Sequence, residues 1–326
     1  MKVHKEIVMR RRWIGLGAIL TIIALGAATL SFGGNSIRKE IFAQAMPVDY
    51  FAEYGRITPD LYKVSGSTYA FEREFSRSMV LRTPEGIAIF DTFDTPHMKA
   101  LKEALAEKFP GENVRWVVLS HNHLDHVRGS TVFPDADIIG HENINKLVAD
   151  WPNVNKDVAL VTTPISEDQN LTLGGVVVKA LFVPFSHSHT LYGFHIPADD
   201  VVFAPDMMFV NAMPPFGFPD FYYPGYIRAL DRLIAVDAKH YVPSHLDRGT
   251  RQDLIAFRNM TVEFQHVVED EYRKIDPVEF PRGVGMREAV RSAYDRLQPK
   301  YGHIHGFDDM FVPKFGRHIA GTYLGY

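Results

Sequence analysis

The chain has 326 residues, of which 46% are hydrophobic and 23% are charged, and its formal net charge is −4. This length and composition are typical of a globular protein with a substantial core, and the slight acidity argues against a basic nucleic-acid-binding surface. The chain contains no cysteine. Disulfides and thiolate metal sites are therefore excluded, and any metal ion must be bound by histidine and carboxylate side chains.

Residues 1–45 are expected to form a targeting segment rather than part of the globular body. The basic cluster Arg10-Arg11-Arg12 precedes an uncharged apolar stretch from Trp13 to Gly34, and the pattern Ala43-Gln44-Ala45 follows. This order is typical of a cleaved export signal, but residues 13–34 are also long enough to form an uncleaved membrane anchor. Both alternatives predict an exported body, periplasmic or extracellular, that contacts a membrane only through this segment. The start of the stretch also resembles a twin-arginine signal.

The remainder, residues 46–326, is predicted to alternate between strands and helices. Short runs rich in Val, Ile, Phe and Tyr predict strands, and apolar residues three and four apart predict helices. In chain order we expect strands at 60–71 and 77–90 (with a turn at 84–86), a helix at 95–109, strands at 114–119 and 137–140, a helix at 141–150, strands at 158–163, 171–183, 191–196 and 201–204, a helix at 226–236, a strand at 240–242, and helices at 252–274 and 286–297. This pattern predicts the α/β class, with a mixed sheet covered by helices. Residues from about 275 to 326 are expected to form a C-terminal helical appendage.

Four potential metal ligands follow the strand at 114–119, namely His121, His123, Asp125 and His126. Side chains two positions apart in an extended segment point the same way, so His121 and His123 can reach one ion. His126 interrupts that alternation and would suit a second ion. Imidazole and carboxylate ligands without thiolate suit zinc, iron, manganese or nickel.

The segment from Ser120 to Gly129 resembles the H-x-H-x-D-H motif of the metallo-β-lactamase-fold hydrolases. Four further segments resemble those of that family in the same order, and they are Ile89 to Thr92, Pro184 to Thr190, Ala204 to Asp206 and Pro243 to His245. The resemblance covers roughly residues 60–248. It implies a four-layer αββα sandwich, in which two mixed β-sheets are flanked by helices.

The resemblance also implies two metal sites. His121, His123 and His189 would hold one ion. Asp125, His126 and His245 would hold a second ion, and Asp206 would bridge the two. Two zinc ions per chain are expected, with iron or manganese as alternatives. Asp125 is also the residue expected to take part in catalysis, and Asp91 is expected to hold one of the imidazoles by its free N–H.

Either of two histidines could be the metal ligand of the segment at 184–190, because His187 lies two residues before His189. Thr190 follows His189 as it does in the family, and this favours His189. Two departures from the family pattern put the local backbone in question: Ser188 and Pro205 stand where the family usually has glycine.

The resemblance implies an exported dinuclear hydrolase that attacks an ester, lactone or similar acyl bond with a metal-bound hydroxide. Asp206 resembles the ligand of lactonase and thioesterase members, whereas β-lactamases proper have Cys or no acidic ligand there. The short interval from Asp206 to His245 leaves no room for the inserted domain of the nucleic-acid-cleaving branch. The aromatic segment from Met213 to Tyr226 contains no cation. It is either a loop packed on the core or a substrate wall, and it favours an uncharged or acyl small molecule. The alternatives are a mononuclear iron dioxygenase of sulfur compounds on the same fold, or a β-lactam hydrolase.

Overall fold

The computed structural model describes residues 58–215, 221–280 and 283–324. The predicted export signal or anchor in residues 1–45 lies outside this range. Among the described residues, no helix is both long enough and apolar enough to cross a bilayer.

The described residues form two β-sheets. The first contains, in spatial order, β1 (Asp60–Ser65), β2 (Thr68–Arg73), β3 (Ser76–Thr83), β4 (Gly86–Phe90), β5 (Val114–Val118), β6 (Asp137–His141) and β7 (Thr163–Ile165). Its strands are antiparallel from β1 to β4 and parallel from β4 to β7. The second contains β12 (His240–Pro243), β11 (Val201–Ala204), β10 (Tyr192–Ile196), β9 (Val176–Phe182) and β8 (Gln169–Leu173), with only β11 and β12 parallel. Both sheets are therefore mixed, as predicted.

The two sheets pack face to face over an apolar core. Phe90 and Val118 of the first sheet share this core with Phe194 and Phe203 of the second. The rings of Phe90 and Phe194 lie 5.2 Å apart, centroid to centroid. Alternating side chains on the other face of the first sheet point away from this core, so each sheet needs a further covering layer.

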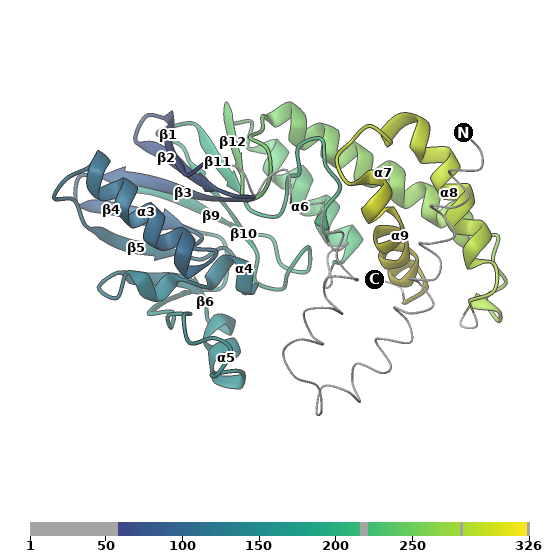
Figure 1. Ribbon diagram of the computed structural model, residues 1–326, viewed down its shortest axis with the longest axis horizontal. Coiled ribbons are helices and arrows are strands. Elements are labelled where there is room, and N and C mark those ends of the chain that lie inside the picture. Colours follow the sequence, from purple (N-terminus) through teal and green to yellow (C-terminus); the bar gives the residue numbers. More distant parts are fainter. Residues whose placement is uncertain (1–57, 216–220, 281–282, 325–326) are drawn as a thin grey trace. The chain divides into compact units, whose positions relative to one another are not determined.

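Helices supply those outer layers (Figure 1). On the first sheet lies α3 (Thr95–Lys108), whose N-cap Asp94 accepts a hydrogen bond from the backbone N–H of His97 and whose Met98, Leu101 and Leu105 are buried. On the second sheet lies α6 (Tyr223–Ala235), where Leu233 packs so close to Gly193 of β10 that a Cβ there would come within 2.6 Å of it. The predicted four-layer αββα sandwich is confirmed.

Two predicted strands are hairpins instead. The strand expected at 60–71 turns at Gly66, and the strand expected at 171–183 turns at Gly174 and Gly175, and all three glycines have positive φ. Glycine adopts this backbone conformation without the steric penalty of a side chain. The strand expected at 158–163 is confined to β7, which begins at Thr163.

Three further helices, α7 (Arg251–Tyr272), α8 (Met286–Tyr301) and α9 (Phe307–Leu324), follow the second sheet. Thr250 and Asp253 form a capping box at the start of α7, and α7 packs beside α6, α8 and α9. His305, between α8 and α9, exchanges backbone hydrogen bonds with Asn211 and Met213. The described part of the predicted C-terminal appendage is thus helical and pairs with the segment that follows Asp206.

Candidate metal centre

The histidine motif lies where β5 ends and a short helix begins. His121 is buried directly after the strand, His123 is the N-cap residue of α4 (Leu124–Val127), and Asp125 and His126 lie on α4 itself. Gly129 ends this segment with φ +77°, and a Cβ there would lie 2.4 Å from the carbonyl oxygen of Asp94. Only glycine fits this close approach. Four potential ligands are therefore displayed from one rigid strand end.

Three other potential ligands follow strands of the second sheet. His187 lies beyond β9, Asp206 beyond β11 and His245 beyond β12. These three strands run in the same direction, because β10 is antiparallel to both β9 and β11 and because β12 is parallel to β11. Their carboxyl ends therefore meet at one edge of the sheet, where the sequence places the side chains.

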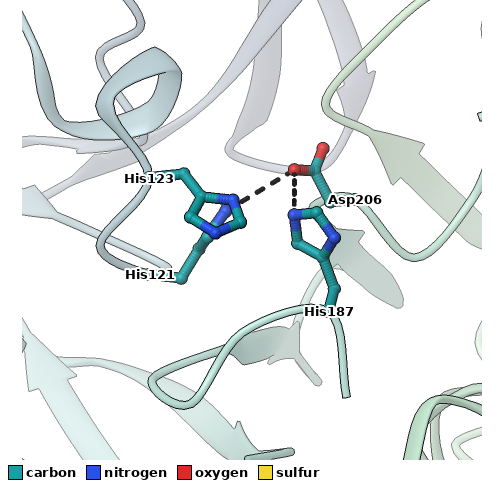
Figure 2. Close-up of side chains that lie close together, drawn as sticks. All are labelled: His121, His123, His187 and Asp206. Atoms are coloured by element: carbon teal, nitrogen blue, oxygen red, sulfur yellow. Dashed lines mark ion pairs between the residues drawn. The ribbon is translucent and has the colours of Figure 1, made fainter. Parts of the chain in front are cut away.

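His121, His123, His187 and Asp206 form one group, whose ligand atoms all lie within 4.8 Å of one another. Figure 2 shows the three imidazoles facing the carboxylate of Asp206. Oδ2 of Asp206 lies 2.9 Å from Nε2 of His187 and 3.5 Å from Nε2 of His121. We call these four residues the inner group, because His121, His187 and Asp206 are buried.

Asp125, His126 and His245 form a second group with the same spacing limit. Nε2 of His126 lies 3.1 Å from Nε2 of His245, and Oδ2 of Asp125 lies 3.8 and 3.7 Å from these two atoms. The side chain of Asp125 is 62% exposed, so we call these three residues the outer group. Asp206 also contacts them, at 3.0 Å from His126 and 3.2 Å from His245. Its carboxylate thus lies between the two groups, where the sequence predicts a bridging ligand.

The structure contradicts the choice of His189 as a ligand and brings His187 to the site instead. His187 is only 3% exposed, whereas His189 is exposed and packs its ring against Phe185, at 5.1 Å between centroids. Side chains two apart point the same way only in an extended chain. Here the backbone turns at Phe185, which has φ +51°.

The residues that flank the two histidines fix this turn. The hydroxyls of Ser188 and Thr190 both donate to Oδ1 of Asn122, at 2.8 and 2.9 Å, and Thr190 Oγ1 accepts from the backbone N–H of Asn122 at 3.0 Å. Thr190, the residue that favoured His189 in the sequence, therefore joins two loops rather than marking its neighbour as a ligand. Ser188, in place of the usual glycine, contributes the second hydroxyl of this clamp.

Hydrogen bonds behind the imidazoles determine which ring nitrogen faces the centre. Asp91 accepts from the backbone N–H and the hydroxyl of Ser120, both at 2.8 Å, and lies 2.8 Å from Nδ1 of His126. Because the Ser120 hydroxyl donates to Asp91, its oxygen accepts from Nδ1 of His121 at 2.9 Å. In their neutral forms both rings then present an unprotonated Nε2 to the centre, as a metal ligand requires. Asp91 holds an imidazole as predicted.

The charges of the centre are strongly coupled. Burial opposes ionisation of Asp206, but His126, His245 and His187 outweigh it and hold the pKa of this carboxyl well below its ordinary value. Burial, reinforced by His126 and His123, holds the pKa of His121 well below its ordinary value. Burial also opposes protonation of His126, but Asp206, Asp125 and Asp91 raise the pKa of this imidazole well above its ordinary value. The arrangement thus favours the ionised form of Asp206 among the imidazoles.

The donor set fits a metal ion. Nε2 of His121 is buried and makes no hydrogen bond, and the carboxylate of Asp206 lies 3.5 Å away. A buried polar atom without a hydrogen bond is costly, and a cation shared with Asp206 would satisfy it. Histidine and carboxylate ligands without thiolate suit divalent zinc, iron or manganese.

Two other residues near the centre, Arg128 and Tyr226, have structural contacts. Arg128 ends α4 and donates to the carbonyl of Val154 at 3.0 Å, with Asp157 3.4 Å away. Tyr226, from the aromatic segment, is buried and donates to the carbonyl of Asp206 at 2.8 Å. It therefore positions a ligand backbone, because its hydroxyl already has this acceptor.

The fold and these residues together define an αββα protein with a candidate dinuclear metal centre. The model of the metallo-β-lactamase superfamily matches residues 72–245, which contain every ligand candidate described above. The chain belongs to the metallo-β-lactamase superfamily.

Two relatives are similar to the chain in sequence. The chain is 27% identical over 259 residues to the beta subunit of a 2,4-dinitroanisole O-demethylase from Nocardioides sp. (strain JS1661), which covers 76% of this chain and 77% of that subunit. It is 25% identical over 197 residues to the alpha subunit of that enzyme, 59% of each chain.

Solved structures show the shared fold. A metallo-β-lactamase from Pontibacter korlensis has a TM-score of 0.54 at 17% identity, covering 63% of this chain and 99% of its own. A double mutant of the sec-alkyl sulfatase PisA1 has a TM-score of 0.64 at 13% identity, covering 87% of this chain and 53% of its own. The structural likeness to the sulfatase therefore covers more of this chain than the likeness to the β-lactamase does.

Proposed function

We propose that the protein is a dinuclear metal-dependent hydrolase that cleaves an ester, lactone or similar acyl bond. The position of Asp206 is the observation on which this proposal depends. One buried carboxylate lies within 3.5 Å of His121, His126, His187 and His245, which belong to both groups. A carboxylate between two groups of imidazoles suits a bridging ligand.

Each group would hold one ion, and we propose zinc, with iron or manganese as alternatives. His121, His123, His187 and Asp206 would hold the first ion, and Asp125, His126, His245 and Asp206 the second. When bound, two such ions would supply a water of lowered pKa at neutral pH, polarise the bond under attack and stabilise the charge that develops on its oxygen.

The side chains of the site would orient the ligands, accept a proton and exclude water. Asp91 and Ser120 orient His126 and His121, so that their Nε2 atoms face the centre. Asp125 is the carboxylate of the site that solvent can reach, and we propose that this carboxylate orients the attacking water and accepts its proton. The buried inner group excludes water from the other side of Asp206 and so strengthens electrostatic interactions there.

The substrates in the names of the similar proteins support a reaction that breaks a bond to an oxygen atom. A demethylase of 2,4-dinitroanisole acts on an aryl methyl ether, and a sec-alkyl sulfatase acts on a sulfate ester. The panel of substrates should therefore extend beyond acyl compounds. We propose an uncharged or acyl small molecule as substrate, with no nucleic acid as partner.

We also propose that the protein is exported, to the periplasm or outside the cell, by the segment in residues 1–45. The basic cluster, the apolar stretch and the Ala43-Gln44-Ala45 pattern support this. Cell fractionation, together with the N-terminal sequence of the mature protein, separates a cleaved signal from an anchor at residues 13–34.

The test is metal quantification followed by a substrate panel of lactones, aryl esters, thioesters, an alkyl sulfate, 2,4-dinitroanisole and a β-lactam. We expect about two zinc ions per chain and hydrolysis of an acyl substrate that Asp125→Asn reduces strongly. Asp135→Asn removes an exposed carboxylate elsewhere and should leave activity intact. A single iron per chain with oxygen uptake would instead identify a sulfur-compound dioxygenase, and preferential turnover of the β-lactam a lactamase.

A further inference from the structure

Arg77 of β3 lies beneath the loop that carries His245, and it is only 2% exposed. Its guanidinium donates to the carbonyls of Pro243 (3.1 Å), Leu246 (2.7 Å) and Asp247 (3.4 Å). The remaining donors reach Oε2 of Glu72, at 3.2 Å from Nε and 3.0 Å from Nη2. An arginine has five N–H groups in a rigid planar fork, and here each of them has an acceptor.

The three carbonyls bracket His245 in the sequence. Leu246, the next residue, has φ +60°, a left-handed conformation that is unfavourable for a non-glycine residue and persists only where the surroundings enforce it. Backbone hydrogen bonds also join this loop to the start of β3. They run from Arg77 N–H to Ser244 O (2.6 Å) and from Leu246 N–H to Phe75 O (2.9 Å). The guanidinium therefore holds a loop in a conformation that the loop would not keep alone.

The imidazole of His245 is itself oriented by its neighbours. Its ring packs against Phe75 and Phe93, at 6.0 and 5.4 Å between centroids, and its Nδ1 lies 3.3 Å from the carbonyl of Phe75. Nε2 is thus directed towards Asp206 and His126. The loop backbone determines the position from which the side chain of His245 extends. A displacement of this backbone would therefore move Nε2 of His245 away from Asp206 and His126.

We infer that Arg77 is a positioning residue for the outer group, and that its five hydrogen bonds determine where His245 stands. This inference rests on the proposed function, since the outer group is the second metal site of that proposal. The inner group contains no residue of the loop at 243–247. Ser244 of this loop donates to Oδ1 of Asp206 at 2.9 Å, so the loop also contacts the inner group. The loss of Arg77 therefore weakens the outer site, which contains His245 itself, more than the inner site.

The chain offers a matched control in Arg248. This residue donates to Glu72 as Arg77 does, and it also pairs with Asp60 at 3.0 Å. It donates to none of the three loop carbonyls, and its side chain is 51% exposed. In Arg77→Met, Glu72 keeps Arg248 as a partner, so the change does not leave a buried charge unpaired.

The experiment compares Arg77→Met, Arg77→Lys and Arg248→Met with the wild type in the full chain. Zinc affinities are measured by competition with a chromophoric chelator, and circular dichroism confirms the fold. We expect Arg77→Met to weaken the second zinc about 10- to 100-fold, the scale of losing an outer partner of a metal ligand, and to weaken the first zinc much less. Arg248→Met should leave both affinities unchanged. Lysine has three donors without the planar fork, so Arg77→Lys should be intermediate, and it serves alone if Arg77→Met does not fold.

A second measurement does not depend on metal. Hydrogen exchange of the backbone at 243–248 in the metal-free protein should be faster in Arg77→Met than in Arg248→Met. Equal exchange, or equal loss of both zinc ions, would overturn the inference. If the wild type binds only one ion, the two-ion proposal fails, and the exchange rates still decide whether Arg77 holds the loop.

Discussion

The inner and outer groups differ in how they are enclosed. The inner group is buried and joins loops of both sheets, which Asn122, Ser188 and Thr190 clamp together. The outer group is open at Asp125, and its two imidazoles are held from behind by Asp91 and by the loop above Arg77. The difference suggests a division of labour. In the proposed dinuclear hydrolase, the inner group would retain its ion, whereas the outer group would leave a face of its ion accessible to substrate.

The largest effect is expected where the two groups meet. Asp206→Asn keeps the shape of the side chain but removes the charge shared by both groups, and so should weaken both ions. We expect kcat to fall on the order of 10²- to 10³-fold, the scale seen when a group that stabilises developing charge is deleted. Metal content and kcat measured on the same preparation test this. Retention of both ions with full activity would show that Asp206 does not bridge.

The second prediction separates the two neighbouring histidines. His187→Ala should weaken the inner ion by more than about 100-fold, beyond the range of an outer partner, because its Nε2 faces Asp206. His189→Ala changes an exposed ring on the same loop and should leave both affinities as they are. Zinc titration of the two variants side by side is the measurement. The reverse pattern would restore His189 as the ligand.

The third prediction concerns the support of the outer group. Asp91→Asn removes the carboxylate that faces Nδ1 of His126 and should weaken the outer ion roughly 10- to 100-fold. Asp94→Asn is the control, because asparagine caps a helix about as well as aspartate. Isothermal titration with zinc compares the variants. An equal loss in both would mean that Asp91 supports the fold rather than His126.

The smallest effect is on the pH dependence of stability. His97 lies behind the outer group, 3.1 Å from the Ser78 hydroxyl that donates to the carbonyl of Asp91. Burial, with the charges of Arg73 and His245, lowers its pKa to about 3. The unfolded chain therefore binds one more proton between about pH 6.5 and 3, so stability is lost as the pH falls through this window.

Replacing His97 by glutamine should remove that loss. The slope of the unfolding free energy against pH should be about 1.4 kcal/mol per pH unit shallower in His97→Gln between pH 4 and 6. Urea denaturation of the metal-free proteins at several pH values measures the slopes. Identical slopes would mean that His97 is protonated in the folded protein.

The parts of the centre that the sequence predicts are those encoded locally. The ligands at 121–126 follow a buried strand, and Asp206 and His245 follow two others, so the end of each strand places its side chain. His187 could not be chosen from the sequence, because the choice depends on the turn at Phe185 and on hydroxyl contacts with Asn122, 66 and 68 residues away. Thr190 followed His189 as in the family and therefore gave a misleading signal.

Arg77 shows the same limit over a longer separation. Its acceptors at Pro243, Leu246 and Asp247 lie 166 to 170 residues along the chain, and nothing near Arg77 in the sequence indicates them. The hairpins at Gly66 and Gly174 differ from this case. Glycine is itself a turn signal in a sequence, so these glycines indicate where both predicted strands divide.

The ligands are shared between the sheets: those at 121–126 follow the first sheet, and His187, Asp206 and His245 follow the second. A partly folded chain with only one sheet formed would therefore contain about half of the ligands of each group. Metal binding should then require that both sheets of the sandwich are formed. A ligand that binds only the native state adds RT ln(1 + [L]/Kd) to its stability. Each tenfold rise in free zinc above its dissociation constant should then add about 1.4 kcal/mol for each bound ion. Metal supply would in that way set how long the folded protein survives proteolysis, as well as how fast it works.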